Sequence, residues 1–154
     1  MAIVITELAA TNKESGMRTL IGLASLALIA GCSTTPVSEE LAKQIPAERI
    51  YDQAITRTVS NDESTVTFLR DEGFYGSGCS HVVYVNNRKA FAIRSGEGIR
   101  LHLVPGSYFF RLETGAGMCP NIATSQNSEL KPGAHEAYRI LLPSDGSLRL
   151  TRIQ

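Results

Sequence analysis

The feature that most constrains the fold is a series of short apolar runs, separated by turn-forming residues, that begins at Thr65 and continues to the end of the chain. The runs are rich in β-branched and aromatic residues, which is typical of β-strands. Gly, Asn, Asp and Pro fill the gaps between them. The pattern predicts seven strands, at residues 65–70, 81–85, 90–94, 99–104, 107–113, 137–142 and 147–153.

Alternation within these runs indicates how the strands are buried. In 99–103 and 148–153 apolar and polar residues mostly alternate, which predicts one buried and one wet face. Residues suited to tight turns separate three pairs of runs, at Asn86-Asn87, Pro105-Gly106 and Asp145-Gly146. We therefore predict a mainly β fold over residues 61–154, a small antiparallel β-sandwich of about seven strands.

A different pattern precedes this region. Residues 20–30 form an uncharged apolar run, with Arg18 before it and small residues after it, the layout of a signal peptide over 17–31. The run is too short for a transmembrane helix, which needs about 20 apolar residues. Ile29-Ala30-Gly31-Cys32 resembles the lipobox of bacterial lipoproteins. The resemblance implies cleavage before Cys32, acylation of this cysteine, and a lipid bilayer as a partner of the acylated residue.

The same resemblance implies a location. Ser33, rather than Asp, follows the cysteine, which implies sorting to the outer membrane of a bacterial cell envelope, facing the periplasm. Glu7 and Glu14 stand where a signal peptide has a basic region, so we interpret residues 1–16 as an upstream extension, with Met17 as the functional start. The alternative is that Cys32 is an ordinary cysteine and the leader is cut elsewhere or retained.

The segment between the cysteine and the strands divides in two. Residues 32–38 are small and polar apart from Val37, which predicts a flexible tether after the lipidated Cys32. Residues 39–60 carry apolar side chains among charged ones, and Pro46 can open a helix, so we predict a pair of short helices and a linker. These helices would pack on the edge of the sheet or form a strip that binds a partner.

Two successive hairpins over residues 83–112 carry a family resemblance. One strand ends in Asn86-Asn87, the next is followed by Gly96-Glu97-Gly98, and Pro105-Gly106 precedes an aromatic strand. This order resembles the PEGA-like domains of unknown function found in small envelope lipoproteins. The resemblance implies a transthyretin-like or immunoglobulin-like sandwich, and it implies no activity, because these families have no catalytic residues to transfer.

Charge and cysteine content narrow the function further. Lys and Arg together number 15, as do Asp and Glu, so the chain has no net field to hold nucleic acid. Once Cys32 is acylated, Cys79 and Cys119 are the remaining thiols, and in an oxidising compartment we expect them to form a disulfide. A redox pair or a metal site is the alternative, but neither cysteine lies in a Cys-x-x-Cys motif.

No pattern of residues identifies a reaction. His81, His102 and His135 fall on or beside three different predicted strands without metal-ligand spacing, and Ser77 lies in a glycine-rich loop with no helix after it. The acidic pairs Glu39-Glu40, Asp62-Glu63 and Asp71-Glu72 are typical of a solvated surface. We predict no catalytic residue, no metal site and no cofactor.

The loop 71–80 is the most distinctive surface element, since Phe74 and Tyr75 lie there between glycines. These side chains would either bind a partner or cap the core. The leading hypothesis is a non-enzymatic, membrane-anchored module that binds an envelope protein or has a structural role. A module that binds a small ligand or glycan, in a cleft lined by Tyr84, Tyr108 and Tyr138, is the second. An enzyme whose residues converge only in three dimensions is the third.

Overall fold

The computed structural model describes residues 34–114, 119–143 and 145–154. The predicted extension 1–16, signal peptide 17–31 and lipidated Cys32 lie outside these residues. The described elements are β1 (Lys43–Gln44), η2 (Ala47–Arg49), η3 (Ala54–Thr56), β2 (Ser64–Arg70), β3 (His81–Val85), β4 (Arg88–Ile93), β5 (Glu97–Leu103), β6 (Gly106–Thr114), β7 (Ala123–Leu130), β8 (His135–Leu141) and β9 (Arg149–Arg152). The predicted mainly β fold is confirmed.

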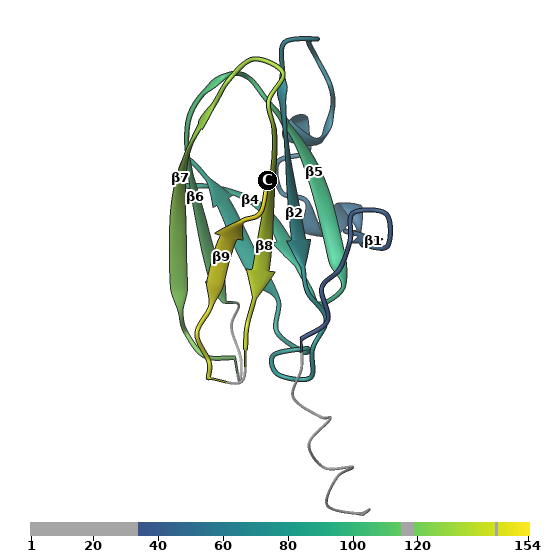
Figure 1. Cartoon of the computed structure of the whole chain (residues 1–154), viewed down its shortest axis with the longest axis vertical. Helices are drawn as coiled ribbons and strands as arrows, with labels where there is room; N and C mark the ends of the chain where they lie inside the picture. Colours follow the sequence, from purple (N-terminus) through teal and green to yellow (C-terminus); the bar gives the residue numbers. More distant parts are fainter. Residues whose placement is uncertain (1–33, 115–118, 144) are drawn as a thin grey trace, which may run out of the picture. The chain divides into compact units, whose positions relative to one another are not determined.

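The strands form two sheets that share one hydrophobic core (Figure 1). The first sheet has the order β1-β5-β2-β8-β9, and the second has the order β4-β3-β6-β7. Aromatic contacts join the sheets, because the Phe68 ring of β2 lies 5.4 Å from Phe91 of β4 and 5.3 Å from Phe110 of β6. Tyr138 of β8 stacks on Phe68 at 5.3 Å. Period-two alternation turns each of these side chains inward.

Seven of the strands, β2 to β6, β8 and β9, match the predicted ones, with ends that differ by no more than about two residues. The prediction missed β7, which pairs with β6 from Glu113↔Ala123 to Gly106↔Leu130. Its sequence, ATSQNSEL, is rich in residues with low β propensity. Pairing with β6 therefore makes this segment a strand, and no local preference of its residues indicates it.

The prediction of a purely antiparallel arrangement was wrong. β2 pairs in parallel with β8, from Thr65↔His135 to Arg70↔Ile140, and β1 pairs in parallel with β5. Hairpin turns specify antiparallel pairing only between strands that are neighbours in sequence. The Asn86-Asn87 hairpin is confirmed, since these residues have φ of 48° and 63° and β3 pairs antiparallel with β4. The second predicted hairpin, with its turn at Pro105-Gly106, was wrong, because β5 belongs to the first sheet and β6 to the second, so the chain crosses between the sheets at this turn.

The segment 34–60 differs from both predictions made for it. It contains the short strand β1 and two single 3-10 turns in place of helices, and its first residues are bound to the fold rather than forming a free tether. Ile45 belongs to the core, so the folded unit begins well before residue 61. Among the described residues no helix has the length and hydropathy needed to cross a membrane.

Candidate functional site

The candidate site is the place where residues 34–45, which we call the stem, join the two-sheet fold. Thr35 and Glu72 exchange backbone hydrogen bonds: the Thr35 nitrogen lies 2.7 Å from the Glu72 oxygen, and the Glu72 nitrogen lies 3.0 Å from the Thr35 oxygen. Val37 is buried, and Ile45 lies in the core. The stem is therefore part of the folded domain from its first described residues.

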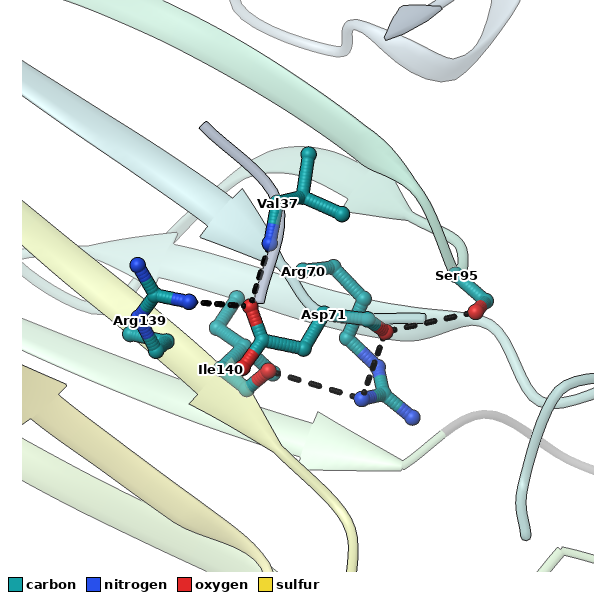
Figure 2. Close-up of polar contacts among 6 residues, drawn as sticks. All are labelled: Val37, Arg70, Asp71, Ser95, Arg139 and Ile140. Carbon is teal, nitrogen blue, oxygen red and sulfur yellow. Dashed lines mark hydrogen bonds and ion pairs between the residues drawn. The ribbon is translucent and has the colours of Figure 1, made fainter. Parts of the chain in front are cut away.

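A buried carboxylate holds the stem (Figure 2). Asp71, which is 1% exposed, directly follows β2. Its Oδ1 accepts the Val37 N–H at 3.1 Å and the Arg139 guanidinium of β8 at 2.7 Å. Its backbone carbonyl accepts Ser95 Oγ and Arg70 Nη1, each at 3.2 Å. One residue thus connects the stem, two strands of the first sheet and the β4–β5 turn.

Asp71 was predicted to be a solvated surface residue, and this prediction was wrong. Its neighbour Glu72 is exposed, as expected. The carboxylate of Asp71 is buried because the stem covers it and because Arg139 lies across from it on β8. No local signal reveals this, since the residues that neutralise the charge are far away in sequence.

A second group of contacts holds the stem farther along. Glu39 forms an ion pair with Arg100 of β5 and accepts a hydrogen bond from Thr67 Oγ1 at 3.1 Å. A side chain on Gly98 would collide with the stem, because its Cβ would lie 2.7 Å from the Ala42 Cβ. Glycine at this position therefore allows the stem to lie directly on β5.

Arg49 of η2 and Glu97 of β5 form the next contact. Two hydrogen bonds join them, at 2.8 Å (Nη1 to Oε2) and 2.5 Å (Nη2 to Oε1). Burial raises the pKa of Glu97, but the hydrogen bonds from Arg49 and from the Arg94 N–H outweigh burial, so the pKa lies below the ordinary value. The carboxylate therefore stays charged, and the pair joins the segment after the stem to the first sheet.

The two basic residues that flank the loop 71–80 in sequence are buried in the core. Arg70 and His81 both point inward, as their alternation with Phe68 and Val83 requires, and both are fully buried. Neither ring nitrogen of His81 has a hydrogen-bond partner in the described part of the chain, and neither has Arg70 Nε. Burial, and secondly the charge of Arg70, lower the pKa of His81 to about 4. The ring is therefore neutral at pH 7.

The loop 71–80 itself is braced. Cys79 and Cys119 form the predicted disulfide, with a Cα–Cα distance of 5.8 Å. Gly76 adopts φ of 67° directly above Leu142, and its carbonyl accepts the Cys79 N–H at 2.9 Å. Phe74 is nevertheless 88% exposed and Tyr75 is 43% exposed. The loop therefore presents its aromatic side chains to solvent, and they do not cap the core.

The three histidines do not converge. His81 is inside the core, whereas His102 and His135 flank Thr65 on the outer face of the first sheet. His135 Nδ1 lies 2.5 Å from Thr65 Oγ1. Ser77, the serine considered as a nucleophile, lies in the loop 71–80. Residues 34–114, 119–143 and 145–154 contain no group of three or more His, Cys, Asp or Glu side chains that could hold a metal ion.

The three tyrosines proposed to line a ligand cleft do not share one. Tyr138 is buried in the core, and Tyr108 stacks on Phe110, with ring centroids 6.0 Å apart, on the inner face of the second sheet. Tyr84 alternates with buried Val83 and Val85, so it lies on the outer face, where the Arg111 guanidinium is 4.1 Å from its ring centroid. The sequence thus grouped side chains that the fold separates.

Two comparisons of the sequence with known proteins identify no relative. The chain matches no protein-family model and no curated protein sequence.

Proposed function

We propose that the chain is an outer-membrane lipoprotein of a bacterial envelope, acylated on Cys32, whose β-sandwich faces the periplasm as a non-enzymatic module that binds or supports another protein. The docked stem is the observation that carries the proposal. Thr34 comes two residues after the lipobox cysteine, and Thr35 already pairs with Glu72. The proposed anchor therefore leads directly into the folded domain, without a long linker.

The disulfide supports a location in the envelope. Cys79–Cys119 closes a loop with a sequence separation of 40 residues. Bonds of this kind persist in the periplasm and outside the cell, and they are rare in the bacterial cytoplasm. Export and oxidation of this cysteine pair agree with a leader that ends at Cys32.

The strand order supports a transthyretin-like sandwich over an immunoglobulin-like one. In the immunoglobulin fold the first two strands pair in the same sheet. Here β2 and β3, the first two long strands, belong to different sheets. Of the two folds that the resemblance to PEGA-like domains implies, the transthyretin-like one is therefore our proposal.

The open edge of β7 supports the binding of a protein partner. β7 is the last strand of the second sheet, and the Thr114 N–H donates to Ile122 O at 3.0 Å. Antiparallel alternation then directs the backbone groups of the even-numbered residues toward β6, and those of Ala123, Ser125, Asn127 and Glu129 toward the open edge. Within Ala123–Leu130 no Pro, Lys or bulge protects this edge and Glu129 is the one charged residue, so an extended segment of a partner could pair with it.

Metabolic labelling with an alkyne fatty acid tests the anchor. We expect the wild-type protein to incorporate the label, to lose residues 1–31 and to partition with outer membranes, and the Cys32→Ser protein to do none of these. The matched control replaces the other two cysteines, Cys79→Ser with Cys119→Ser, and should keep the label. Equal labelling of the Cys32→Ser protein would refute the proposal.

Site-specific photo-crosslinking in native membranes tests the edge. A crosslinker at Ser125 should yield a defined protein adduct. An added Asn127→Pro substitution should abolish it, because proline blocks pairing at the edge while its missing N–H is not needed by β6. The same crosslinker at Thr151, which is exposed on β9, is the control position. An adduct at Ser125 that persists after the Asn127→Pro substitution would exclude pairing through β7.

A further inference from the structure

The loop that presents Phe74 lies at the same end of the fold as the start of the stem (Figure 1). Glu72 exchanges backbone hydrogen bonds with Thr35, and a Cβ on Gly73 would lie 3.1 Å from the Thr34 Cγ2. The aromatic loop, which we define as residues 73–78, therefore begins in contact with the stem.

Covalent geometry sets how far a lipid on Cys32 can be from this loop. Two residues of extended chain span at most about 7 Å, so the Cys32 Cα lies within that reach of Thr34. The polar interfacial region of a bilayer is of similar depth, about 5 to 8 Å on each side of the hydrocarbon. Acyl chains on Cys32 would thus bring the aromatic loop to the membrane surface.

The chemistry of the aromatic loop suits that surface. Its sequence, GFYGSG, carries no charge, and Phe74 is the most exposed of the large apolar side chains described. Glu72, which directly precedes the loop, pairs with Lys43 at 4.0 Å, and Asp145, which precedes the glycine beside the Tyr75 hydroxyl, pairs with Arg149 at 3.3 Å. No excess of negative charge therefore repels anionic headgroups. Tyr75 combines an aromatic ring with a hydroxyl group, and amphipathic rings of this kind are enriched at membrane interfaces.

The bracing of the loop favours insertion. The Ser77 N–H donates to Phe74 O at 3.3 Å, the Cys79 N–H donates to Gly76 O at 2.9 Å, and the disulfide fixes the end of the loop. Phe74 is therefore already held outward, and little ordering is needed when it enters lipid.

We propose that Phe74 and Tyr75 insert into the interfacial region of the leaflet that holds the Cys32 acyl chains. This inference rests on the proposed lipid anchor. Acyl chains alone would tether the domain at one point, and the aromatic loop adds a second contact that fixes its orientation. The sequence suggested a protein as the partner of these side chains, but their position beside the stem favours lipid.

Tryptophan fluorescence in the lipidated full chain tests the proposal. The chain contains no Trp, so Phe74→Trp introduces a single fluorophore. The matched control is Val104→Trp, at a residue that is 61% exposed. Val104 follows Leu103, which pairs with the first residue of β2, so the seven-residue strand β2 separates it from the loop by about 20 Å. Both proteins are reconstituted into phosphatidylcholine vesicles containing brominated lipid.

We expect brominated lipid to quench the indole of the Phe74→Trp protein and shift its emission to the blue, and to leave the emission of the Val104→Trp protein unchanged. Mass spectrometry of the same samples reports whether Cys32 is acylated. An unquenched indole in acylated Phe74→Trp protein would overturn this inference and leave the anchor intact, whereas unacylated protein would overturn both. Quenching in both variants would exclude the proposed orientation. Shielding of the Phe74→Trp indole in native membranes but not in pure lipid would assign the loop to a protein partner.

Discussion

His81 should make the stability of the fold depend on pH in a range where carboxyl groups contribute little. The ring is 0% exposed, and its pKa is about 4 in the folded protein. In the unfolded chain a histidine pKa is about 6.5. As the pH falls below about 6.5, the unfolded state binds a proton that the folded state does not, so protonation favours unfolding. The free energy of unfolding therefore begins to fall as the pH drops below about 6.5, and the contribution of His81 to this loss is complete near pH 4.

The size of the effect follows from the difference between the two pKa values of His81. At pH 5 the unfolded ring is almost fully protonated and the folded ring, with its pKa of about 4, is mostly neutral. The resulting loss of stability is about 2 kcal/mol. His81→Leu removes this loss, and it also removes two buried nitrogens that lack partners in the described residues. At pH 7.5 the variant should therefore be as stable as the wild type, or more stable by about 1 to 3 kcal/mol.

Urea unfolding of residues 33–154 with the disulfide intact, followed by circular dichroism at pH 7.5 and pH 5, measures the difference. We expect the wild type to lose about 2 kcal/mol more than His81→Leu between these pH values. His135→Leu, which removes an exposed histidine, is the matched control and should behave like the wild type. If the wild type and His81→Leu lose equal stability, or if the His81 resonance titrates near pH 6.5 in the folded protein, the reasoning is refuted.

The remaining predictions concern the stem and the disulfide. Asp71→Asn should destabilise the domain by about 1 to 3 kcal/mol and increase amide exchange at Val37, because the ion pair with Arg139 is lost. Asp62→Asn, at an exposed residue, is the control and should change neither quantity. Gly98→Ala should reduce the free energy of unfolding by about 1 to 3 kcal/mol and speed amide exchange at Lys43, whose N–H donates to Gly96 O at 2.9 Å. Gly78→Ala is the control, because nothing lies within 4 Å of its Cβ, and it should change neither the urea unfolding nor the exchange. Replacing Cys79 and Cys119 by Ser should reduce the free energy of unfolding by about 4 kcal/mol, and a loss below about 1 kcal/mol would contradict the chain-entropy estimate.

The sequence by itself determined those features that depend on local preferences. Alternation of apolar and polar residues identified seven strands, because a half-buried strand imposes a period of two on its own residues. Asn86-Asn87 indicated a hairpin, since few residues adopt positive φ at low cost. The pairing of Cys79 with Cys119 followed from counting thiols, once Cys32 is assigned to lipid.

Only the tertiary structure decided the features that depend on partners far away in sequence. β7 is a strand because β6 supplies its hydrogen bonds, although its own residues favour loops. No turn in the sequence indicates the parallel pairing of β2 with β8. The sequence around Asp71 is typical of a surface acid. Only the fold brings Val37, 34 residues away, and Arg139, 68 residues away, into contact with its carboxylate. A tether and a docked stem can share one composition, because docking depends on the surface that receives the segment.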